Sequence, residues 1–376
     1  MTDYDLIIIG AGIHGAAVAR AASYDGYKVC VLEQYSQAAT ATSRSSSKLI
    51  HGGLRYLESF QFSLVKECLN ERKVLLKTAP YLVKLVPFYI PVYKHNSRPG
   101  WMIYLGLLLY RLLGGGKFKK VPKSEWNQLD GLSLTELKSV YQYFDAQTDD
   151  KQLATAVLDD AIKQGTQFKP RHKVAAITCQ QDLITVQTEQ SEKFSCKLLV
   201  NASGPWVNHT LKKITPTIIP LPIELIQGTH IILPRTLNKG VYYIEADDKR
   251  VVFAIPWQQH CLVGTTETLF THEPEHCKPL QAEISYLLQT WNDAFNDKLM
   301  SSDVLESFSG LRVLPAKNSS TFKRKRDTIL HQGIENVISI YGGKLTAHRA
   351  TAETVMNMIH KQLPGHNKTD TSGIVL

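Results

Sequence analysis

The sequence contains little cysteine, and its cysteines are scattered along 376 residues. They are Cys30, Cys68, Cys179, Cys196, Cys261 and Cys277. Disulfide-stapled domains and zinc sites use closely spaced cysteines, so this spacing excludes a disulfide framework and predicts no metal site. The distribution favours a reducing, cytoplasmic location.

The sequence also lacks an apolar run that could cross a bilayer. Its most apolar stretch, residues 101–113, contains Arg111, whereas a spanning helix needs about 20 apolar residues. The stretch predicts either a buried helix or a helix lying in a membrane interface, with aromatic side chains at headgroup level. No basic segment precedes the first apolar run, so we expect no signal peptide.

Acidic residues are fewer than basic ones, 34 against 43, which gives a net charge of +9. Basic side chains concentrate at residues 117–123 and 323–326. These segments predict either solvated loops or attraction to an anionic lipid or substrate. No nucleic-acid-binding motif accompanies the charge, so we expect no nucleic-acid partner.

A nucleotide-binding motif occupies residues 5–33. Two apolar segments that read as strands flank an Ala-rich helix, and Gly10, Gly12 and Gly15 form a GxGxxG turn between the first strand and the helix. Gly10 permits the tight turn, Gly12 lets a pyrophosphate approach the backbone, and Gly15 lets the helix pack against the strand. Glu33 ends the second strand, where an acid can bind ribose hydroxyls. The unit predicts dinucleotide binding.

The acid restricts the choice of dinucleotide. No Arg or Lys follows Glu33 until Arg44, so a 2′-phosphate would meet an unneutralised carboxylate, which argues against NADP. FAD and NAD both remain open on this motif alone.

The rest of the chain predicts a discontinuous α/β fold. Helices are predicted at residues 62–78, 134–142, 150–164, 279–295 and 346–361. Strands are predicted at 174–178, 183–188, 197–201, 218–222, 229–233, 241–244, 251–255, 262–265 and 337–341. Because nucleotide-fold elements stand at both ends and near residue 200, we predict a Rossmann-like cofactor domain (1–80, 150–215 and 320–376) with an inserted antiparallel-sheet α+β substrate domain (81–149 and 216–319).

Four clusters carry the chemistry. The hydroxyl-rich segment 42–47 can satisfy phosphate and ribityl oxygens, and Arg55 beyond it offers a bidentate fork for an anion. The small residues 201–204 end a predicted strand and can lie against a nucleotide. Residues 253–257 and 264–267 could line a substrate pocket with Arg312, which needs an anionic partner if buried.

The fourth cluster, residues 341–346, is a second strand–glycine–helix junction. Its helix N-terminus and Lys344 could stabilise negative charge at the N1–C2=O edge of a reduced flavin. The residues that we predict to bind the cofactor are Gly10, Gly12, Gly15, Glu33, Thr42, Ser43, Ser47, Lys48, Leu49, Val174, Ala202, Gly204, Gly342, Gly343, Lys344, Leu345 and Thr346.

These clusters, taken together and in this order, resemble the FAD-dependent glycerol-3-phosphate dehydrogenases, which are D-amino-acid-oxidase-like flavoproteins. The resemblance covers nearly the whole chain, and residues 47–58 are its most specific part. It implies non-covalent FAD, a location at the cytoplasmic face of the membrane with peripheral association, and electron delivery to quinone.

The sequence departs from the family pattern in three places. Ala347-His348-Arg349 follows Gly-Gly-Lys-Leu-Thr where relatives usually have Thr-Tyr-Arg, and Val313 follows Gly-Leu-Arg where relatives typically have Pro-Leu and then acidic residues. Bacterial members usually continue into a further C-terminal helical domain, which we expect this chain to lack.

The resemblance and the charges imply a reaction. We expect oxidation of sn-glycerol 3-phosphate, a small anionic polyol, to dihydroxyacetone phosphate by hydride transfer to flavin N5, with quinone or another acceptor taking the electrons. Arg55 and Arg312 are expected to bind the phosphate or the developing carbonyl oxygen, and Tyr56 to hydrogen-bond the substrate. His230 is the favoured base because imidazole titrates near neutrality, with His51 and Lys344 as alternatives.

Other functions remain open on the sequence. The same two arginines could clamp the carboxylate of a 2-hydroxy or 2-amino acid in an FAD-dependent oxidase or dehydrogenase. The chain could also be a flavin-binding subunit that is active only with a partner. An NAD-only dehydrogenase leaves the junction at Gly342 unexplained.

Overall fold

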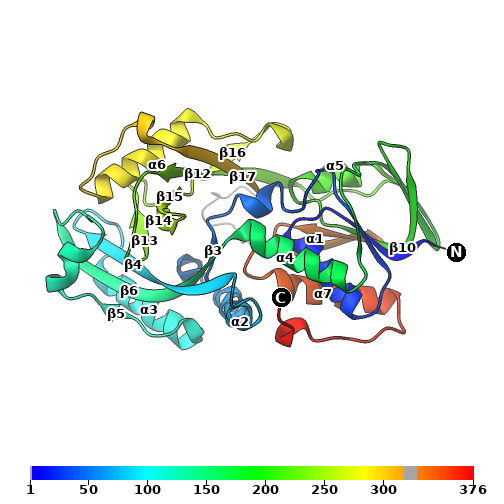
Figure 1. Cartoon of the computed structure of the whole chain (residues 1–376), viewed down its shortest axis with the longest axis horizontal. Coiled ribbons are helices and arrows are strands. Elements are labelled where there is room, and N and C mark those ends of the chain that lie inside the picture. Colours follow the sequence, from blue (N-terminus) through cyan, green and yellow to red (C-terminus); the bar gives the residue numbers. More distant parts are fainter. Residues whose placement is uncertain (1, 317–327) are drawn as a thin grey trace.

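The computed structural model describes residues 2–316 and 328–376, and in Figure 1 these form two halves, each built on one sheet. The N- and C-terminal segments lie together in one half, whereas residues from the middle of the chain form the other. The basic segment 323–326 lies outside the described residues.

The first sheet is built on parallel strands. Its strands are β1 (Tyr4–Ile9), β2 (Val29–Leu32), β7 (Gln167–Lys169), β8 (Val174–Gln180), β9 (Leu183–Thr188), β10 (Lys193–Asn201), β11 (Ile214–Thr215), β18 (Ile329–Ile334) and β19 (Val337–Tyr341). The order β19-β10-β1-β2-β7 is parallel throughout. Leu6, Ile7 and Ile8 are fully buried, because a parallel strand of this kind is covered on both faces.

Three helices cover one face of the first sheet: α1 (Ile13–Tyr24), α4 (Asp150–Lys163) and α7 (His348–Gln362). The side chains of α1 are mostly alanine and therefore short, so this helix packs closely against the other two helices. On the opposite face, side chains of β8 and β9, which continue the sheet beyond β10, share a core with the short helix α5 (Val207–Leu211).

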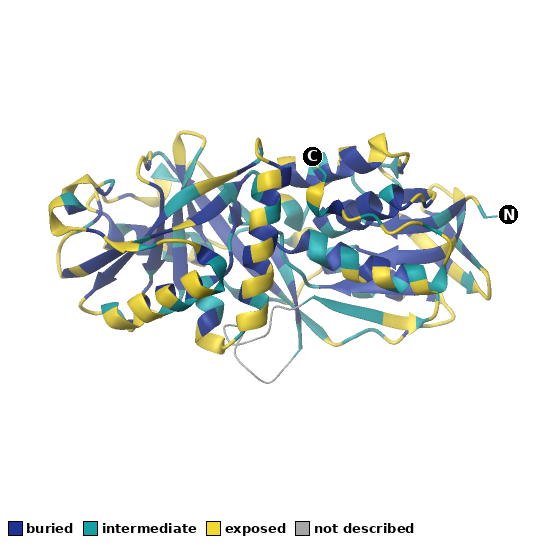
Figure 2. Ribbon diagram, turned by 90° about the horizontal axis from the view of Figure 1, so that it is seen from below, coloured by how far each residue is buried: buried dark blue, intermediate teal, exposed yellow. Residues whose placement is uncertain are grey.

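The second sheet is almost entirely antiparallel. Its strands are β3 (Leu49–Ile50), β4 (Val83–Tyr93), β5 (Lys119–Lys120), β6 (Leu137–Thr148), β12 (Ile223–Leu233), β13 (Val241–Glu245), β14 (Val251–Trp257), β15 (His260–Gly264), β16 (Thr268–Phe270) and β17 (Glu306–Pro315). Helix α6 (Gln281–Ala294) packs on one face, and α2 (Phe62–Thr78) and α3 (Gly100–Tyr110) pack on the other. Figure 2 shows that the strands are mostly buried, whereas the helices are buried on one side and exposed on the other.

The two halves share contacts in the middle of the molecule. Strand β3, which directly follows the hydroxyl-rich segment, pairs with β6 of the second sheet. In the other direction, Val313 of β17 packs into the core of the first sheet, together with Ile223 and Leu225 of β12.

The predicted fold class is confirmed: a Rossmann-like α/β unit carries an antiparallel sheet. The predicted helices at 62–78, 150–164, 279–295 and 346–361 correspond to α2, α4, α6 and α7. The strands of the proposed cofactor domain lie in the first sheet except β3, and the domain boundaries themselves stay a prediction.

Two predicted elements are wrong. Residues 134–142 do not form a helix, because the β-prone run containing Val140, Tyr141 and Tyr143 pairs along its length with β4 as β6. Residues 218–222 do not form a strand, and β12 begins at Ile223. Pro220 and Pro222 lack the amide N–H that a strand ladder requires.

The apolar stretch 101–113 forms α3 and the turn that follows it. Ile103 and Leu107 pack into the core, whereas Trp101 and Leu105 face outward. In the described parts of the chain, every helix is too short or too polar to cross a bilayer.

Candidate active site

A cavity of about 530 Å³ opens where three parallel strands of the first sheet end. Gly10 follows β1, Ala202 follows β10 and Gly342 follows β19, and all three residues line the cavity. Because the strands are parallel neighbours, their carboxyl ends meet at one edge, where open α/β sheets bind ligands. The three glycine-containing segments that are far apart in the sequence therefore form one wall, the nucleotide wall.

The turn from β1 into α1 requires glycine at two positions. Gly10 has φ of +100°, and a Cβ on Gly15 would lie 1.9 Å from the carbonyl oxygen of Gly10. Ser43 comes close to the helix start, and its Oγ accepts a hydrogen bond of 2.9 Å from the amide of Ile13. The N-terminus of α1 is thus exposed to the cavity, as a pyrophosphate site requires.

Glu33 lies at the far end of the nucleotide wall. Its Oε2 accepts a 2.8 Å hydrogen bond from the amide of Ala11, and its Oε1 accepts one of 3.0 Å from the amide of Tyr35. Burial raises the pKa of Glu33, and the amide hydrogen bonds offset only part of this increase. The carboxylate is therefore held in place at the position from which an acid binds ribose hydroxyls.

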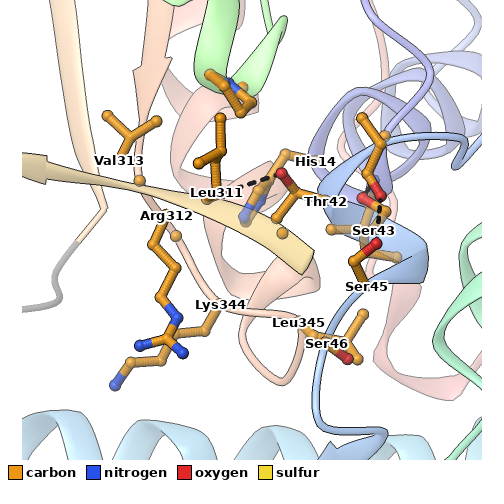
Figure 3. A pocket seen from close by; sticks show the side chains of 18 of the residues that line it. His14, Thr42, Ser43, Ser45, Ser46, Leu311, Arg312, Val313, Lys344 and Leu345 are labelled. Carbon is orange, nitrogen blue, oxygen red and sulfur yellow. Dashed lines mark hydrogen bonds between the residues drawn. The ribbon is translucent and has the colours of Figure 1, made fainter. Parts of the chain in front are cut away.

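The hydroxyl-rich segment runs along the cavity, as Figure 3 shows for Thr42, Ser43, Ser45 and Ser46. Thr42 Oγ1 donates a 3.0 Å hydrogen bond to the carbonyl oxygen of Leu311, which ties the segment to β17.

The side chain of Lys48 points away from the cavity. It is buried away from the cavity lining, and its Nζ donates to Asp150 Oδ1 at 2.5 Å and to the carbonyl oxygen of Arg44. Its charge therefore anchors the hydroxyl-rich segment to α4, and the contact of Lys48 with the cofactor stays a prediction. Gly15 also lies outside the cavity lining, behind the turn that it makes possible.

The opposite side of the cavity carries a guanidinium pair, Arg55 and Arg312. Arg55 lies in the 3₁₀ turn Leu54–Ser59 and Arg312 lies in β17, yet both contact one oxygen of Glu267. The distances to Glu267 Oε1 are 3.4 Å from Arg55 Nη2 and 3.1 Å from Arg312 Nη1. We call Arg55, Arg312, Glu267 and Lys344 the anion wall.

Lys344 extends into the cavity beside Arg312, and Figure 3 shows the two side chains directed the same way. Its Nζ lies 3.8 Å from the centre of the Tyr56 ring, a cation–π distance, and 4.0 Å from the sulfur of Cys68. The predicted substrate residue Tyr56 therefore lies against the predicted flavin residue Lys344.

His230 is buried between the two walls. Its Nε2 is 2.9 Å from Ser47 Oγ, its ring stacks on Phe308, and its Nδ1 has no hydrogen-bond partner among the described residues. Burial lowers the pKa of His230 well below its ordinary value, and the charges of Arg312 and Lys48 lower it further. The imidazole is therefore neutral at neutral pH in the free protein.

The structure brings together most of the predicted site residues. The predicted residues that line the cavity are Gly10, Gly12, Glu33, Thr42, Ser43, Ser47, Leu49, His51, Arg55, Tyr56, Val174, Ala202, Gly204, His230, Arg312, Gly342, Gly343, Lys344, Leu345 and Thr346. Their individual roles stay predictions.

His14 and Arg250 are among the cavity residues that sequence reasoning missed. His14 occupies a variable position of the GxGxxG turn, and its ring lies where a Cβ of Gly343 would be. Arg250 follows a polar turn that reads as solvated, but its Nη1 donates to the carbonyl oxygen of Glu267 at 3.3 Å. The position of His14 inside the GxGxxG motif could have predicted its place in the cavity, whereas no nearby motif indicated that Arg250 lies there.

The cavity fits a flavin dinucleotide. Cβ atoms on Gly10 or Gly15 would collide with the protein's own backbone, so these glycines let strand and helix pack closely at the turn, and Gly12 between them lines the cavity without a side chain. The Nδ1 atom of His14 is buried at the cavity without a hydrogen-bond partner among the described residues, which leaves a polar group for a ligand to satisfy.

Comparison with known proteins agrees with this geometry. The family model described as FAD dependent oxidoreductase matches residues 5–358. The aerobic glycerol-3-phosphate dehydrogenase of Escherichia coli is 36% identical over 100% of this chain and 77% of its own length. The D-erythritol 1-phosphate dehydrogenase of Brucella abortus is 35% identical over 96% of this chain and 74% of its own length.

Solved structures share the fold. The glycerol-3-phosphate dehydrogenase of Bacillus halodurans complexed with FAD superposes with a TM-score of 0.76 at 24% identity, covering 99% of this chain and 67% of that one. L-alpha-glycerophosphate oxidase from Mycoplasma pneumoniae with FAD bound gives 0.77 at 18% identity, covering 99% and 98%. The chain is an FAD-dependent oxidoreductase and belongs to the glycerol-3-phosphate dehydrogenase family of D-amino-acid-oxidase-like flavoproteins.

Proposed function

We propose that this protein oxidises sn-glycerol 3-phosphate to dihydroxyacetone phosphate and passes the electrons to a quinone. The observation that carries the proposal is the guanidinium pair, which shares Glu267 inside the cavity that holds the nucleotide wall. Bound FAD supplies the two-electron acceptor for the hydride released from C2. The relatives named for glycerol 3-phosphate, at 36% and lower identity, support this choice of substrate.

The anion wall binds and orients the substrate. Arg55 and Arg312 present fork-shaped donors to the phosphate, which suits bidentate binding of a tetrahedral anion. Lys344, held over Tyr56, adds a further positive charge close to the reacting carbon. With the phosphate fixed at one end, the C2 hydroxyl extends toward the nucleotide wall.

His230 takes the proton of the C2 hydroxyl. In the free protein burial opposes protonation of His230 most strongly, and the positive charge of Arg312 adds to this opposition. A bound phosphate dianion offsets that charge, so substrate binding strengthens His230 as a base at the moment when a proton must be accepted. The proton goes to the imidazole and the hydride leaves from C2, which together produce the ketone.

A longer phosphorylated polyol is the second candidate substrate. The D-erythritol 1-phosphate dehydrogenase of Brucella abortus is nearly as similar to this chain as the glycerol-3-phosphate dehydrogenases are. The same anion wall would hold its phosphate.

Anaerobic mixing of the holoenzyme with glycerol 3-phosphate tests the proposal. We expect loss of the oxidised flavin absorbance and formation of one dihydroxyacetone phosphate per flavin. Parallel samples contain D-erythritol 1-phosphate, glycerol, lactate and D-alanine. Bleaching by a 2-hydroxy or 2-amino acid without bleaching by glycerol 3-phosphate would reject the proposed substrate. Reoxidation by a soluble quinone faster than by oxygen would support quinone as the acceptor.

We propose in addition that α3 and the segment after it contact the membrane surface. Trp101 and Leu112 expose 67% and 76% of their surface, and Leu105 and Tyr104 also face outward. The exposed Lys117, Lys119 and Lys120 follow directly. An apolar helix face beside a basic segment fits an anionic lipid surface.

Co-sedimentation with vesicles tests this contact. We expect binding to vesicles that contain phosphatidylglycerol and weaker binding to pure phosphatidylcholine. The double variant W101S/L112S should lose binding, whereas a matched change at exposed Ile219 and Leu269, far from α3 in the sequence, should not. Equal binding by both double variants would reject the surface.

A further inference from the structure

Glu267 holds a position that the proposed reaction does not explain. It is a carboxylate inside an anion-binding site, 5% exposed, in contact with both guanidinium groups. A carboxylate next to a phosphate site repels the ligand electrostatically. Its presence therefore requires a contribution that outweighs this repulsion.

The geometry identifies that contribution. Arg55 comes from the turn after β3 and Arg312 from β17, so no local backbone links them. Two guanidinium groups that converge on one space repel each other, and a long side chain loses rotamer freedom when it is fixed. By accepting from Arg55 and Arg312 on the same oxygen, Glu267 offsets the repulsion and orders both side chains before a ligand arrives.

The segment that carries Glu267 has two distinct sides. Thr265 and Glu267 face the cavity, and Thr265 Oγ1 lies 3.2 Å from Arg312 Nη2. Thr266 and Thr268 face away and donate to Glu283 Oε1 at 2.8 and 2.7 Å. An extended segment directs alternate side chains to opposite sides, which is the pattern observed here.

Glu283 at the start of α6 fixes the rear of this segment. It is buried, and its Oε2 accepts from Thr229 Oγ1 and Gln227 Nε2 of β12, both at 2.6 Å. Burial raises the pKa of Glu283, but hydroxyl hydrogen bonds outweigh this and leave it lowered, so the group is ionised at neutral pH. The segment 265–268 is thus tied to the second sheet by one carboxylate and holds the guanidinium pair with another.

We propose that Glu267 is a positioning residue that sets the spacing of the guanidinium pair and thereby prepares the site for a phosphate group. Neighbouring side chains of β17 support this arrangement, because Leu311 and Arg312 point to opposite sides of the strand and only Arg312 is available to the anion wall (Figure 3). The identity of the substrate in this inference rests on the proposed function. The role of Glu267 in binding an anion does not.

Calorimetric titration of the holoenzyme with inorganic phosphate tests the proposal without turnover. Glu267→Gln keeps the shape and removes the charge, and we expect phosphate to bind about tenfold more weakly, as loss of a charged hydrogen bond predicts. If Glu267 only repelled the ligand, this variant would bind phosphate more tightly. Unchanged or tighter binding would overturn the proposal.

Glu306→Gln is the matched control. Glu306 is an exposed glutamate at the start of β17, so its variant removes the same charge from the same strand outside the cavity. We expect phosphate binding as in the unmodified enzyme. Should Glu267→Gln fail to bind FAD, Thr265→Val replaces it: this variant removes an acceptor of Arg312, and we expect about threefold weaker phosphate binding.

Stopped-flow reduction by glycerol 3-phosphate separates positioning from chemistry. In Glu267→Gln we expect the apparent Kd of the substrate to rise about tenfold and the limiting rate of flavin reduction to change by less than about threefold. A fall in the limiting rate with unchanged Kd would overturn the proposal. In a double-mutant cycle, Arg312→Ala should cost less in the Glu267→Gln background than alone, and additive losses would also overturn it.

The two proposals fail in different ways. If glycerol 3-phosphate does not reduce the flavin but Glu267→Gln weakens phosphate binding, the substrate is wrong and the role of Glu267 stands. If glycerol 3-phosphate reduces the flavin and Glu267→Gln binds phosphate normally, the role of Glu267 is wrong and the substrate stands.

Discussion

The nucleotide wall and the anion wall line the same cavity but are built by different means. The nucleotide wall consists of backbone at the ends of parallel strands, and its first turn leaves no room for side chains at Gly10 and Gly15. The anion wall consists of long charged side chains from segments distant in the sequence, arranged around Glu267. Backbone shape holds the first, and electrostatic contacts between side chains hold the second.

This difference decides how each wall responds to change. The backbone turn at Gly10 and Gly15 tolerates no added atoms, and Glu33 is the one charged group that we placed in this wall. A wall of charges tolerates changes of shape but loses its order when one partner is removed, because the remaining group is left partly buried without compensation. Substitutions can therefore disable one wall while the other stays intact.

The largest effect is expected for Gly15→Ala in the nucleotide wall. The added Cβ would lie 1.9 Å from the carbonyl oxygen of Gly10, so the turn must shift and the helix start must move away from the phosphates. We expect the purified protein to be colourless or to lose FAD on gel filtration. Flavin-to-protein absorbance measures this directly.

Gly106→Ala is the control for this substitution. Gly106 lies in α3, and a Cβ there would meet no atom within 4 Å. We expect full FAD content and equal or slightly higher thermal stability, since Ala favours helix over Gly. A yellow Gly15→Ala protein with normal flavin content would show that the turn is less constrained than its geometry indicates.

An intermediate effect is expected for Arg312→Ala in the anion wall. Removal of a charged donor should lower kcat/KM for glycerol 3-phosphate about a hundredfold while FAD content stays normal. The loss should be far smaller for an unphosphorylated alcohol. Arg235→Ala, which removes a partly exposed arginine paired with Asp297, should have little effect. Release of FAD from Arg312→Ala would show that the two walls are not independent.

The smallest effect is expected for the pH dependence of folding stability that His348, at the start of α7, contributes. Burial lowers the pKa of His348 to about 4 from an ordinary 6.5. Below pH 6.5 the unfolded chain binds a proton that the folded protein does not, so stability is lost as pH falls from 6.5 toward 4. The slope is at most about 1.4 kcal/mol per pH unit for one group.

His348→Gln should reduce this acid sensitivity. We expect its unfolding temperature to fall less between about pH 7.5 and about pH 5 than that of the unmodified protein, since one titrating group is gone. His14 titrates in the same range and should keep part of the dependence. The exposed His272→Gln serves as control, and an identical pH dependence in all three proteins would contradict the assignment.

The same contrast explains what the sequence could predict. Gly10, Gly12, Gly15 and Glu33 lie within one short segment because a backbone turn is local, and local patterns are readable. Arg55 and Arg312 were named as a pair through the resemblance, but the part of Glu267 in joining them was not. Only the folded chain brings its two partners together.

The errors have physical causes as well. The β-prone run at Val140 and Tyr141 was read as helical, and its pairing with β4 decided the outcome. The ion partner of Lys48 could not be predicted either, because the buried Asp150 that holds its ammonium group comes from a distant helix. Tertiary partners of this kind leave no trace in the spacing of nearby residues.

The pairing of β3 with β6 bears on how a substrate enters. Strand β3 follows the hydroxyl-rich segment and pairs with β6 of the second sheet, and Val313 of β17 packs in the core of the first sheet. Each half therefore contributes residues to the other. An opening of the two halves relative to each other would break the pairing of β3 with β6 and expose apolar side chains such as Val313. We therefore expect a substrate to enter and a product to leave through movements of side chains at the cavity opening, without a relative movement of the two halves.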